Sequence, residues 1–398
     1  MMDDKGIFIA GSDMNAGKTT FSLGLISWLE ESLSLSVSFM KPLGQKTLLN
    51  DGESVGEDTF LVNSSLGLDM PLEYTAPFTM SSGMAQQYLT EGSPSDLRNR
   101  ISKAFRYLRS RSDLVVVEGT GHPGVGSVFD LCNASVAGLL NIPVLLVLDG
   151  GIGRTIDRFT LCSSLFREKG IPILGVIINR VLEGKVDKVR KYLDPWFAER
   201  GVPVFGYIPY VNSLTEPSIG MLGRELGFRI PENGEDDDVQ AVEGFIAGFG
   251  STREILEDVS RKPRSALLLS PGREEVLDAI LARRLSGGLS HGPGALVLCG
   301  GPPEENAQLA EGCGRLGIPL YRTAGSAGAT MSLLNRRVFK VEPGESVKIS
   351  EIVRTVKANV DLQSLVDSLT SPERPDGKTG AKPMSRLRSW LSRVLGRD

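Results

Sequence analysis

Residues 11–19 read Gly11-Ser12-Asp13-Met14-Asn15-Ala16-Gly17-Lys18-Thr19. They follow an apolar run at residues 7–10 and precede a helical pattern, the context of the phosphate-binding motif G-x-x-x-x-G-K-[ST]. Glycines let backbone N–H groups turn inward, and the start of a helix favours an anion. The motif therefore predicts a phosphate-binding loop in which Lys18 bridges the outer phosphates and the Thr19 hydroxyl holds Mg²⁺. The alternative is a tight turn without a ligand.

The composition indicates an ordinary globular protein of more than one domain. At about 150 residues per domain, 398 residues predict two or three compact units. The net charge of −4 argues against bulk nucleic-acid binding. No secretory pattern opens the chain and no apolar run reaches about 18 residues, so we expect a cytoplasmic location. The cysteines lack paired spacing, which predicts reduced, buried thiols at Cys132, Cys162, Cys299 and Cys313.

Short apolar runs alternate with helical patterns through the first half of the chain. The runs are typical of buried parallel strands, and the patterns between them, such as residues 21–29, are typical of covering helices. A second rhythm of the same kind follows from residue 245. We therefore predict an α/β fold, with a parallel-sheet P-loop NTPase domain followed by a smaller α/β domain. The first-half runs cover residues 7–10, 37–40, 114–117, 144–148, 173–178 and 204–208.

Composition divides the chain into four predicted parts. Residues 1–212 form the P-loop domain, and residues 213–242, with prolines and an acidic run, form a linker. The second α/β rhythm predicts a domain at residues 243–369. Residues 370–398 begin as a flexible linker and end in a basic amphipathic helix. We expect that helix to dock on its own protein, and weak membrane contact is the less favoured alternative.

A second acidic Mg²⁺ ligand is expected at the end of a strand that neighbours the phosphate-binding loop. Glu118 ends the apolar run at residues 114–117 and is our first choice. Asp149 ends the run at residues 144–148 and is the competitor. For either carboxylate, the alternative is a helix cap or a turn.

Five motifs, in order, resemble dethiobiotin synthetase, an enzyme grouped with the cobyrinic acid amide synthetases and the partitioning ATPases. The resemblance covers residues 5–212 and implies a P-loop fold that uses ATP and Mg²⁺. It also implies a homo-oligomer, because the resembled enzymes are dimers. The motifs are residues 11–19, Lys41-Pro42, Glu118-Gly119, Asn179-Arg180 and Gly206-Tyr207-Ile208-Pro209.

The resemblance implies a role for each matching residue. Lys18 binds phosphate, Asn179 recognises adenine, and Lys41 faces the reacting phosphate or carboxylate, where its charge would assist phosphoryl transfer. The alternative for Lys41 is a surface lysine before a turn proline. Lys18 and Lys41 are the catalytic candidates, and the implied Mg²⁺ ligands are Thr19, Asp58 and Glu118. The implied nucleotide-binding residues are Gly11, Ser12, Asp13, Asn15, Ala16, Gly17, Lys18, Thr19, Thr20, Asn179 and Pro209.

The chain departs from dethiobiotin synthetase at residues 119–131, which replace the expected substrate loop and put a biotin precursor in doubt. This loop and residues 149–154 resemble the N-terminal half of long bacterial phosphotransacetylases. Residues 268–274, 298–301 and 321–324 resemble the DRTGG domain of those proteins, where the two domains are regulatory. Only residues 370–398 follow, so we expect no acetyl-transferring domain and no phosphate acetyltransferase activity.

These observations leave two principal functions open. The first is a regulatory, nucleotide-dependent switch or slow ATPase whose DRTGG domain senses a small molecule. The second is an ATP-dependent ligase that activates a small carboxylate or carbamate, for which Arg154 is the nearest candidate to bind a carboxylate. Arg154 has the alternative of pairing with Asp157, and His122, alone in a Gly-rich loop, is given no catalytic role. A relic that binds no nucleotide is a third, disfavoured hypothesis.

Overall fold

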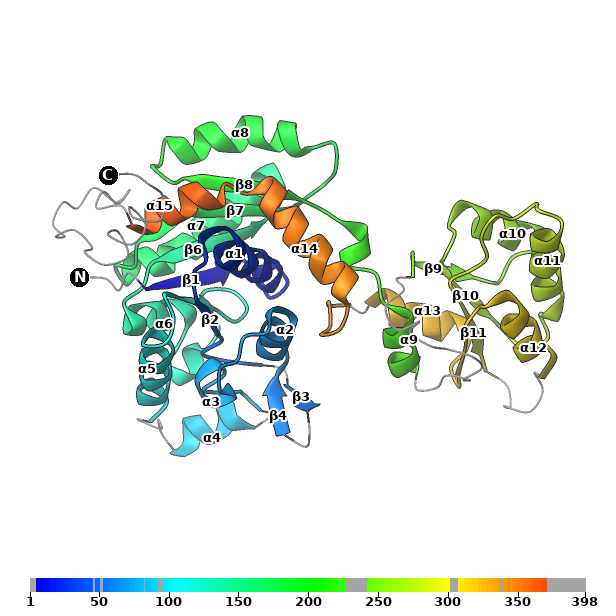
Figure 1. Cartoon of the computed structure of the whole chain (residues 1–398), viewed down its shortest axis with the longest axis horizontal. Helices are drawn as coiled ribbons and strands as arrows, with labels where there is room; N and C mark the ends of the chain where they lie inside the picture. The colour runs from blue at the N-terminus through cyan, green and yellow to red at the C-terminus, as the bar shows by residue number, and fades with distance from the viewer. Residues whose placement is uncertain are drawn as a thin grey trace. The chain divides into compact units, whose positions relative to one another are not determined.

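The computed structural model describes residues 5–45, 47–50, 53–81, 83–91, 96–226, 242–300, 307–336 and 339–370 (Figure 1). These residues form two units. The first contains residues 5–210 and 349–370, and the second contains residues 211–348. The acidic run at residues 235–238 and the expected basic helix near the C-terminus lie outside the described residues.

The first unit is built on a six-stranded sheet with the order β2-β5-β1-β6-β7-β8, and every neighbouring pair is parallel. Each predicted apolar run is one of these strands, so the predicted parallel α/β fold is confirmed. Strands β1, β2, β5 and β6 are buried along their whole length, which explains their unbroken apolar sequences. The strands are β1 (Gly6–Gly11), β2 (Val37–Met40), β5 (Leu114–Glu118), β6 (Val144–Asp149), β7 (Ile173–Val181) and β8 (Val204–Pro209).

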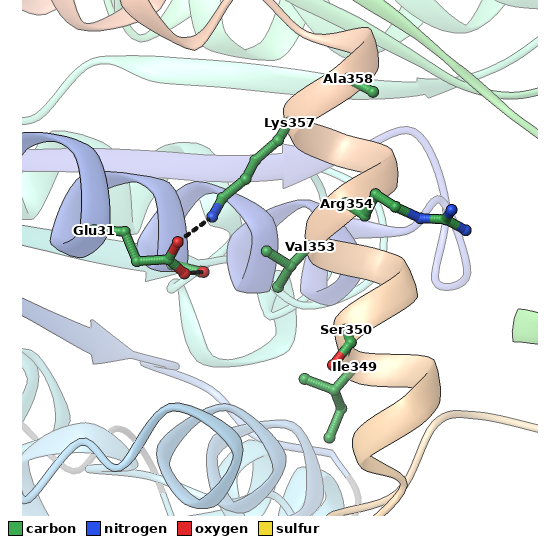
Figure 2. Close-up of a pocket in the computed structure, with 8 residues that line it drawn as sticks. Glu31, Ile349, Ser350, Val353, Arg354, Lys357 and Ala358 are labelled. Atoms are coloured by element: carbon green, nitrogen blue, oxygen red, sulfur yellow. Dashed lines mark hydrogen bonds and ion pairs between the residues drawn. The ribbon is translucent and has the colours of Figure 1, made fainter.

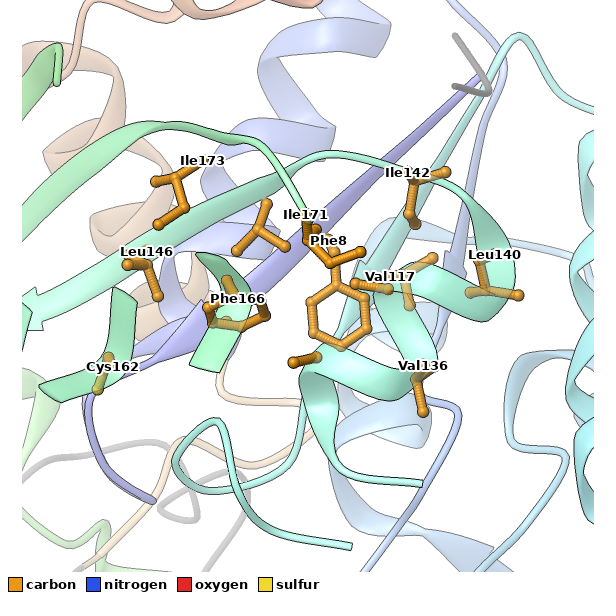
Figure 3. Packing of buried hydrophobic residues seen from close by; sticks show 14 of the residues in the cluster. Phe8, Val117, Val136, Leu140, Ile142, Leu146, Cys162, Phe166, Ile171 and Ile173 are labelled. Carbon is orange, nitrogen blue, oxygen red and sulfur yellow. The ribbon is translucent and has the colours of Figure 1, made fainter. Parts of the chain in front are cut away.

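Helices cover this sheet on both faces. Phe8 of β1 joins a core with Val117, Leu146 and Phe166 (Figure 3). Its strand neighbour Ile7 points to the other face and is just as buried, so neither face is left to solvent. A small antiparallel hairpin, β3 (Thr47–Asn50) with β4 (Glu53–Gly56), follows β2. The helices are α1 (Lys18–Leu33), α2 (Glu57–Leu66), α3 (Leu72–Thr75), α4 (Met84–Glu91), α5 (Asp96–Arg109), α6 (Asn133–Leu140), α7 (Ile152–Glu168) and α8 (Val186–Ala198), with a 3₁₀ turn η1 (Ser127–Phe129).

The second unit has its own four-stranded parallel sheet, in the order β12-β11-β10-β9. Its strands are β9 (Phe245–Ala247), β10 (Ala266–Leu269), β11 (Ala295–Cys299) and β12 (Leu320–Thr323). Helix α10 starts with a reciprocal capping box between Ser251 and Glu254. The predicted second, smaller α/β region is confirmed. Its other elements are η2 (Asn212–Leu214), α9 (Ile219–Leu226), α10 (Thr252–Arg261), α11 (Glu274–Leu285), α12 (Ala307–Leu316) and α13 (Ala327–Arg336).

The last described helices, α14 (Ser346–Asn359) and α15 (Leu362–Thr370), correct the predicted domain boundary. The sequence placed residues 243–369 in one later domain, whereas residues 349–370 belong to the first unit. Val360 forms an antiparallel bridge with Gly206, and the Asp361 N–H donates to the Phe205 carbonyl at 2.7 Å. Because these partners lie far upstream in the chain, no local sequence pattern predicts the pairing.

Helix α14 also packs against α1, the helix that follows the phosphate-binding loop. Lys357 of α14 reaches Glu31 of α1, with 2.7 Å between Nζ and Oε2 (Figure 2). A groove of about 640 Å³ lies at this contact, and no predicted site residue lines it. We call residues 349–370, which run from the first turn of α14 to the end of α15, the C-terminal strap. The groove is lined by Ser27, Glu31, Ile349, Ser350, Val353, Arg354, Lys357 and Ala358.

No helix among the described residues is long and apolar enough to cross a bilayer.

Candidate functional site

The loop at residues 11–17 joins the end of β1 to the start of α1. It crosses to the neighbouring strand β6, because the Ser12 N–H donates to the Val147 carbonyl at 3.0 Å. Gly17 caps α1 with a φ of 90°, a left-handed conformation that favours glycine. The first residues of α1, Lys18 and Thr19, are thereby held beside the loop. This is the strand–loop–helix arrangement that the motif predicted.

The Lys18 side chain lies back over this loop rather than in solvent. Its Nζ donates to the carbonyls of Asp13 at 3.0 Å, Met14 at 3.3 Å and Gly121 at 3.1 Å. A β-carbon built at Gly11 would lie 2.9 Å from Lys18 Nζ, so glycine is needed where the lysine crosses. The ammonium group thus sits against carbonyl oxygens that phosphate oxygens would replace as acceptors.

The carboxylate of Glu118, at the end of β5, is the centre of the site. It is fully buried, and it accepts hydrogen bonds from Thr19 Oγ1 at 2.9 Å and Ser22 Oγ at 3.1 Å. Lys41 Nζ lies 2.9 Å from Glu118 Oε1. Parallel strands β1, β2 and β5 end at the same edge of the sheet, which brings these side chains together.

Lys41 follows β2 and is buried, not the surface lysine of the alternative. Its Nζ forms ion pairs with Glu118 and with Asp58, which lies in the first turn of α2. Burial by itself would lower the pKa of Lys41, but the charges of Glu118 and Asp58 outweigh it and raise the pKa. Lys41 is therefore a buried cation that pairs with two carboxylates.

The substitute loop at residues 119–131 is anchored by a residue that the sequence did not single out. Asn133, at the start of α6, accepts from the Thr120 N–H at 3.1 Å and donates to the Thr120 and His122 carbonyls, both at 2.9 Å. This anchoring keeps the Gly121 carbonyl beside Lys18. His122 Nδ1 accepts from the Gly124 N–H at 3.2 Å, a contact within the same turn.

Asn179, near the end of β7, lies against the phosphate-binding loop. Its Nδ2 donates to the Ala16 carbonyl at 2.8 Å, and its Oδ1 accepts from the Arg180 N–H at 2.9 Å. Pro209, the other residue implied for the base, ends β8, the neighbouring strand. The structure therefore brings Asn179 to the loop itself. Its implied contact with adenine stays a prediction.

Asp149 and Arg154, which the sequence proposed for Mg²⁺ and for a carboxylate, contact each other. Arg154 Nη2 lies 3.1 Å from Asp149 Oδ2, so Asp157 is not the partner that this ion pair uses. Arg158, which the sequence did not single out, pairs across to Asp13 of the loop with 3.4 Å between Nη2 and Oδ2. Both arginines lie on α7, one helical turn apart, so they share a face of the helix. This spacing could have identified Arg158 from the sequence once Arg154 was a candidate.

Ser22 is the other contributor that sequence reasoning missed. It lies three residues after Thr19 on α1, so both hydroxyls project from one face of the helix toward Glu118. This spacing is a usable signal once Thr19 is placed at a helix start.

Two buried polar atoms at the site have free hydrogen-bonding capacity that a ligand could use. Ser12 Oγ in the loop and Asp149 Oδ1 at the end of β6 are buried and have no hydrogen-bond partner among the described residues, although buried polar atoms are normally paired. The residues therefore fit a bound phosphate-containing group with Mg²⁺. Within the described parts of the chain, no group of three or more His, Cys, Asp or Glu side chains forms a metal site. A magnesium ion here would rely on a hydroxyl and phosphate oxygens as well as carboxylates.

Comparisons with known proteins identify a family and several relatives. A family model described as an AAA domain matches residues 5–218. The chain is 30% identical over 182 residues to an ATP-dependent dethiobiotin synthetase of Clostridium kluyveri, an alignment that covers 44% of this chain and 74% of that enzyme. It is 25% identical over 369 residues to a phosphate acetyltransferase of Nitratidesulfovibrio vulgaris, covering 90% of this chain and 51% of that protein.

The chain thus spans about half the length of the phosphate acetyltransferases that it matches. Among solved structures, the septum site-determining protein MinD of Pyrococcus horikoshii, complexed with Mg-ADP, is 16% identical with a TM-score of 0.34. That match covers 53% of this chain and 83% of the MinD chain. The resemblance of the second unit to a DRTGG domain stays a prediction.

Proposed function

The chain belongs to the AAA domain family, with dethiobiotin synthetases among its homologues, and from this premise we propose that its first unit binds ATP with Mg²⁺ and hydrolyses it slowly. One observation carries the proposal. Thr19, Lys41 and Ser22 converge on the buried carboxylate of Glu118, directly beside the phosphate-binding loop. A fully buried carboxylate is costly unless it is paired or binds a cation.

The residues of this site divide the work between phosphate and metal. Lys18 and the backbone between Gly11 and Gly17 would hold the phosphates, while Thr19, Asp58 and Glu118 would hold Mg²⁺. Bound Mg²⁺ neutralises negative charge on phosphate oxygens. Lys41 would balance charge and orient the reacting groups, because it lies as a buried cation between Glu118 and Asp58.

The regulatory hypothesis is supported over the ligase hypothesis by the contact of Arg154. A ligase needs a group that binds the substrate carboxylate close to the reacting phosphate. The arginine that the sequence offered for this is paired with Asp149. We therefore propose that nucleotide binding switches the protein between two conformations, and that a small molecule bound by the second unit controls this switch. We also propose that the protein is a homo-oligomer and that it is cytoplasmic.

The first test is ATP binding and turnover with Mg²⁺, measured by calorimetry and by phosphate release. Lys18→Ala removes a charge-assisted contact and is expected to weaken ATP binding by about 10- to 100-fold. Lys188→Ala is the matched control, because Lys188 is an exposed lysine on α8 of the same unit. Equal ATP binding by the wild type and Lys18→Ala would refute the proposal.

A second test separates the switch from the ligase. Turnover is measured with a panel of small carboxylates and diamines present. We expect slow hydrolysis that no compound accelerates and that consumes none of them. Strong stimulation, with one compound consumed together with ATP, would establish the ligase instead.

A further inference from the structure

We propose that Asn179 is a positioning residue of the phosphate-binding loop: it holds the Ala16 carbonyl and so aims the Gly17 N–H at the bound phosphates. The resemblance to dethiobiotin synthetase implied a different role for Asn179, the recognition of adenine. The inference rests on the proposed ATP binding and specifies how the loop is kept ready for it.

The two hydrogen bonds of the Asn179 side chain agree on its orientation. Only the Nδ2 group can donate to a carbonyl oxygen, and it donates to Ala16 at 2.8 Å. Only Oδ1 can accept, and it accepts from the Arg180 N–H at 2.9 Å. Arg180 has a left-handed φ of 57°, a conformation uncommon for a side chain of its size. The backbone at Arg180 and the Asn179 side chain therefore hold each other in place.

Planarity of the peptide bond turns this contact into control of the loop. The Ala16 carbonyl and the Gly17 N–H belong to one trans peptide unit, so they point in opposite directions. When Asn179 holds the carbonyl on its own side, the Gly17 N–H must point away from Asn179. Among the described residues, that N–H has no protein acceptor. Inward-pointing N–H groups of this kind bind phosphate in such loops.

Packing around Gly17 prevents Asn179 from moving without disturbing the loop. A β-carbon built at Gly17 would lie 1.9 Å from Asn179 Nδ2, so the amide fills the space beside the glycine. Asn179 is 4% exposed. The Nδ2 group has two N–H donors, and one of them is used by the Ala16 carbonyl. Turning the whole amide toward a base would break that hydrogen bond and leave a buried acceptor unpaired. The contacts therefore support the role of a positioning residue for Asn179.

The test compares ligands that share a triphosphate and differ in the base. Binding of ATP, GTP and inorganic tripolyphosphate, each with Mg²⁺, is measured by calorimetry for the wild type, Asn179→Ala and Asn179→Leu. Leucine has the same branching and the same number of side-chain heavy atoms as asparagine but cannot form its hydrogen bonds, so it fills the space beside Gly17. Asn359→Ala is the matched control, because Asn359 lies on α14 of the same unit and donates only to its own helix, at the Thr355 carbonyl. Thermal unfolding verifies that each variant is folded.

We expect both Asn179 variants to weaken all three ligands by the same factor, between about threefold and tenfold, as for one lost hydrogen bond. Loss of ATP binding alone, with GTP and tripolyphosphate unchanged, would assign Asn179 to the base and overturn the inference. Unchanged binding of all three ligands would overturn it too. Failure of the wild type to bind any of them would instead refute the proposed function.

A crystal structure of the wild type with ATP decides the matter even if both variants unfold. The expected result is Asn179 Nδ2 still within hydrogen-bond distance of the Ala16 carbonyl, with the Gly17 N–H on a phosphate oxygen. An Asn179 amide rotated onto the adenine ring would overturn the inference.

Discussion

At the scale of single residues, the chemistry depends on the buried pairing of Lys41 with Glu118. The two side chains lie 2.9 Å apart, and Glu118 is fully buried. Removing one partner leaves an uncompensated buried charge, whereas removing both leaves only the less buried Asp58 without its cation. The pair therefore makes the site stable without ligand and holds the carboxylate where Mg²⁺ would be bound.

We predict that Lys41→Met lowers the free energy of unfolding by about 3 kcal/mol, because Glu118 then stays buried without its cation. The double variant Lys41→Met/Glu118→Gln is expected to lose less than the sum of the two single variants. Urea denaturation of the four proteins in the cycle measures this. Additive losses would contradict the pairing.

At the scale of elements, the C-terminal strap meets the rest of the first unit at two glycines. A β-carbon at Gly24 of α1 would lie 2.4 Å from Val356 Cβ, and one at Gly206 of β8 would lie 2.4 Å from the Asn359 carbonyl oxygen. The strap could not come so close if either position carried a side chain. The strap is thus fitted to the helix that follows the phosphate-binding loop and to the edge of the sheet.

Gly24→Ala and Gly206→Ala are each expected to destabilise the first unit by about 1–3 kcal/mol, since a methyl group overpacks the contact. Gly153→Ala is the matched control, because its added methyl group meets nothing within 4 Å and lies in α7. That control is expected to be neutral or stabilised by up to about 1 kcal/mol. Chemical denaturation distinguishes them, and three equal effects would argue against the strap contacts.

At the scale of the whole molecule, the two units have separate hydrophobic cores. Phe8, Leu146 and Phe166 belong to the core of the first unit, while Leu267 and Val276 belong to that of the second. A domain with its own core is expected to unfold as a cooperative unit. Buried Cys162 reports on the first unit and buried Cys313 on the second.

We predict two unfolding transitions in calorimetry. ATP with Mg²⁺ should raise the midpoint temperature of only one of them, that of the first unit. Ligand at 100 times its dissociation constant stabilises its own unit by about 2.7 kcal/mol. Alkylation followed by mass spectrometry should show later exposure of Cys162, but not of Cys313, when ATP is present. The Lys18→Ala protein provides the control, and a shift of both cysteines would contradict separate unfolding.

Alkaline pH offers a second view of the cores. Burial raises the pKa of Cys162 to about 11, with Asp13 adding to it against Arg158, and burial raises the pKa of Cys313 to about 12, from 9.0 for an ordinary thiol. A raised pKa favours the neutral thiol in the folded state, so this stabilisation is complete below about pH 9 and is lost as the pH rises toward 11 or 12. The free energy of unfolding of the second unit, measured by urea denaturation from pH 8 to pH 11, should therefore decline less steeply for Cys313→Ala than for the wild type.

Local patterns were enough to predict much of this protein. The motif at residues 11–19 located the phosphate-binding loop, because glycine positions and a following helix are encoded by adjacent residues. The buried parallel strands were predicted from apolar runs, since a strand covered on both faces has no polar alternation. Glu118 and Asp149 each end such a strand, and in the structure the Thr19 hydroxyl donates to Glu118.

Other features were decided only by the tertiary structure. The partners of Asn179, Arg154 and the C-terminal strap depend on which strands become neighbours and on where packing directs each side chain. Asn179 reaches Ala16, 163 residues away, because β7 lies two strands from β1 in the sheet. A helix pattern likewise says nothing about which sheet will bury it, so the strap was placed with the wrong unit. Adjacent residues therefore specify the elements and the chemistry of the loop, whereas long-range contacts, which no local pattern encodes, specify the partner of each side chain.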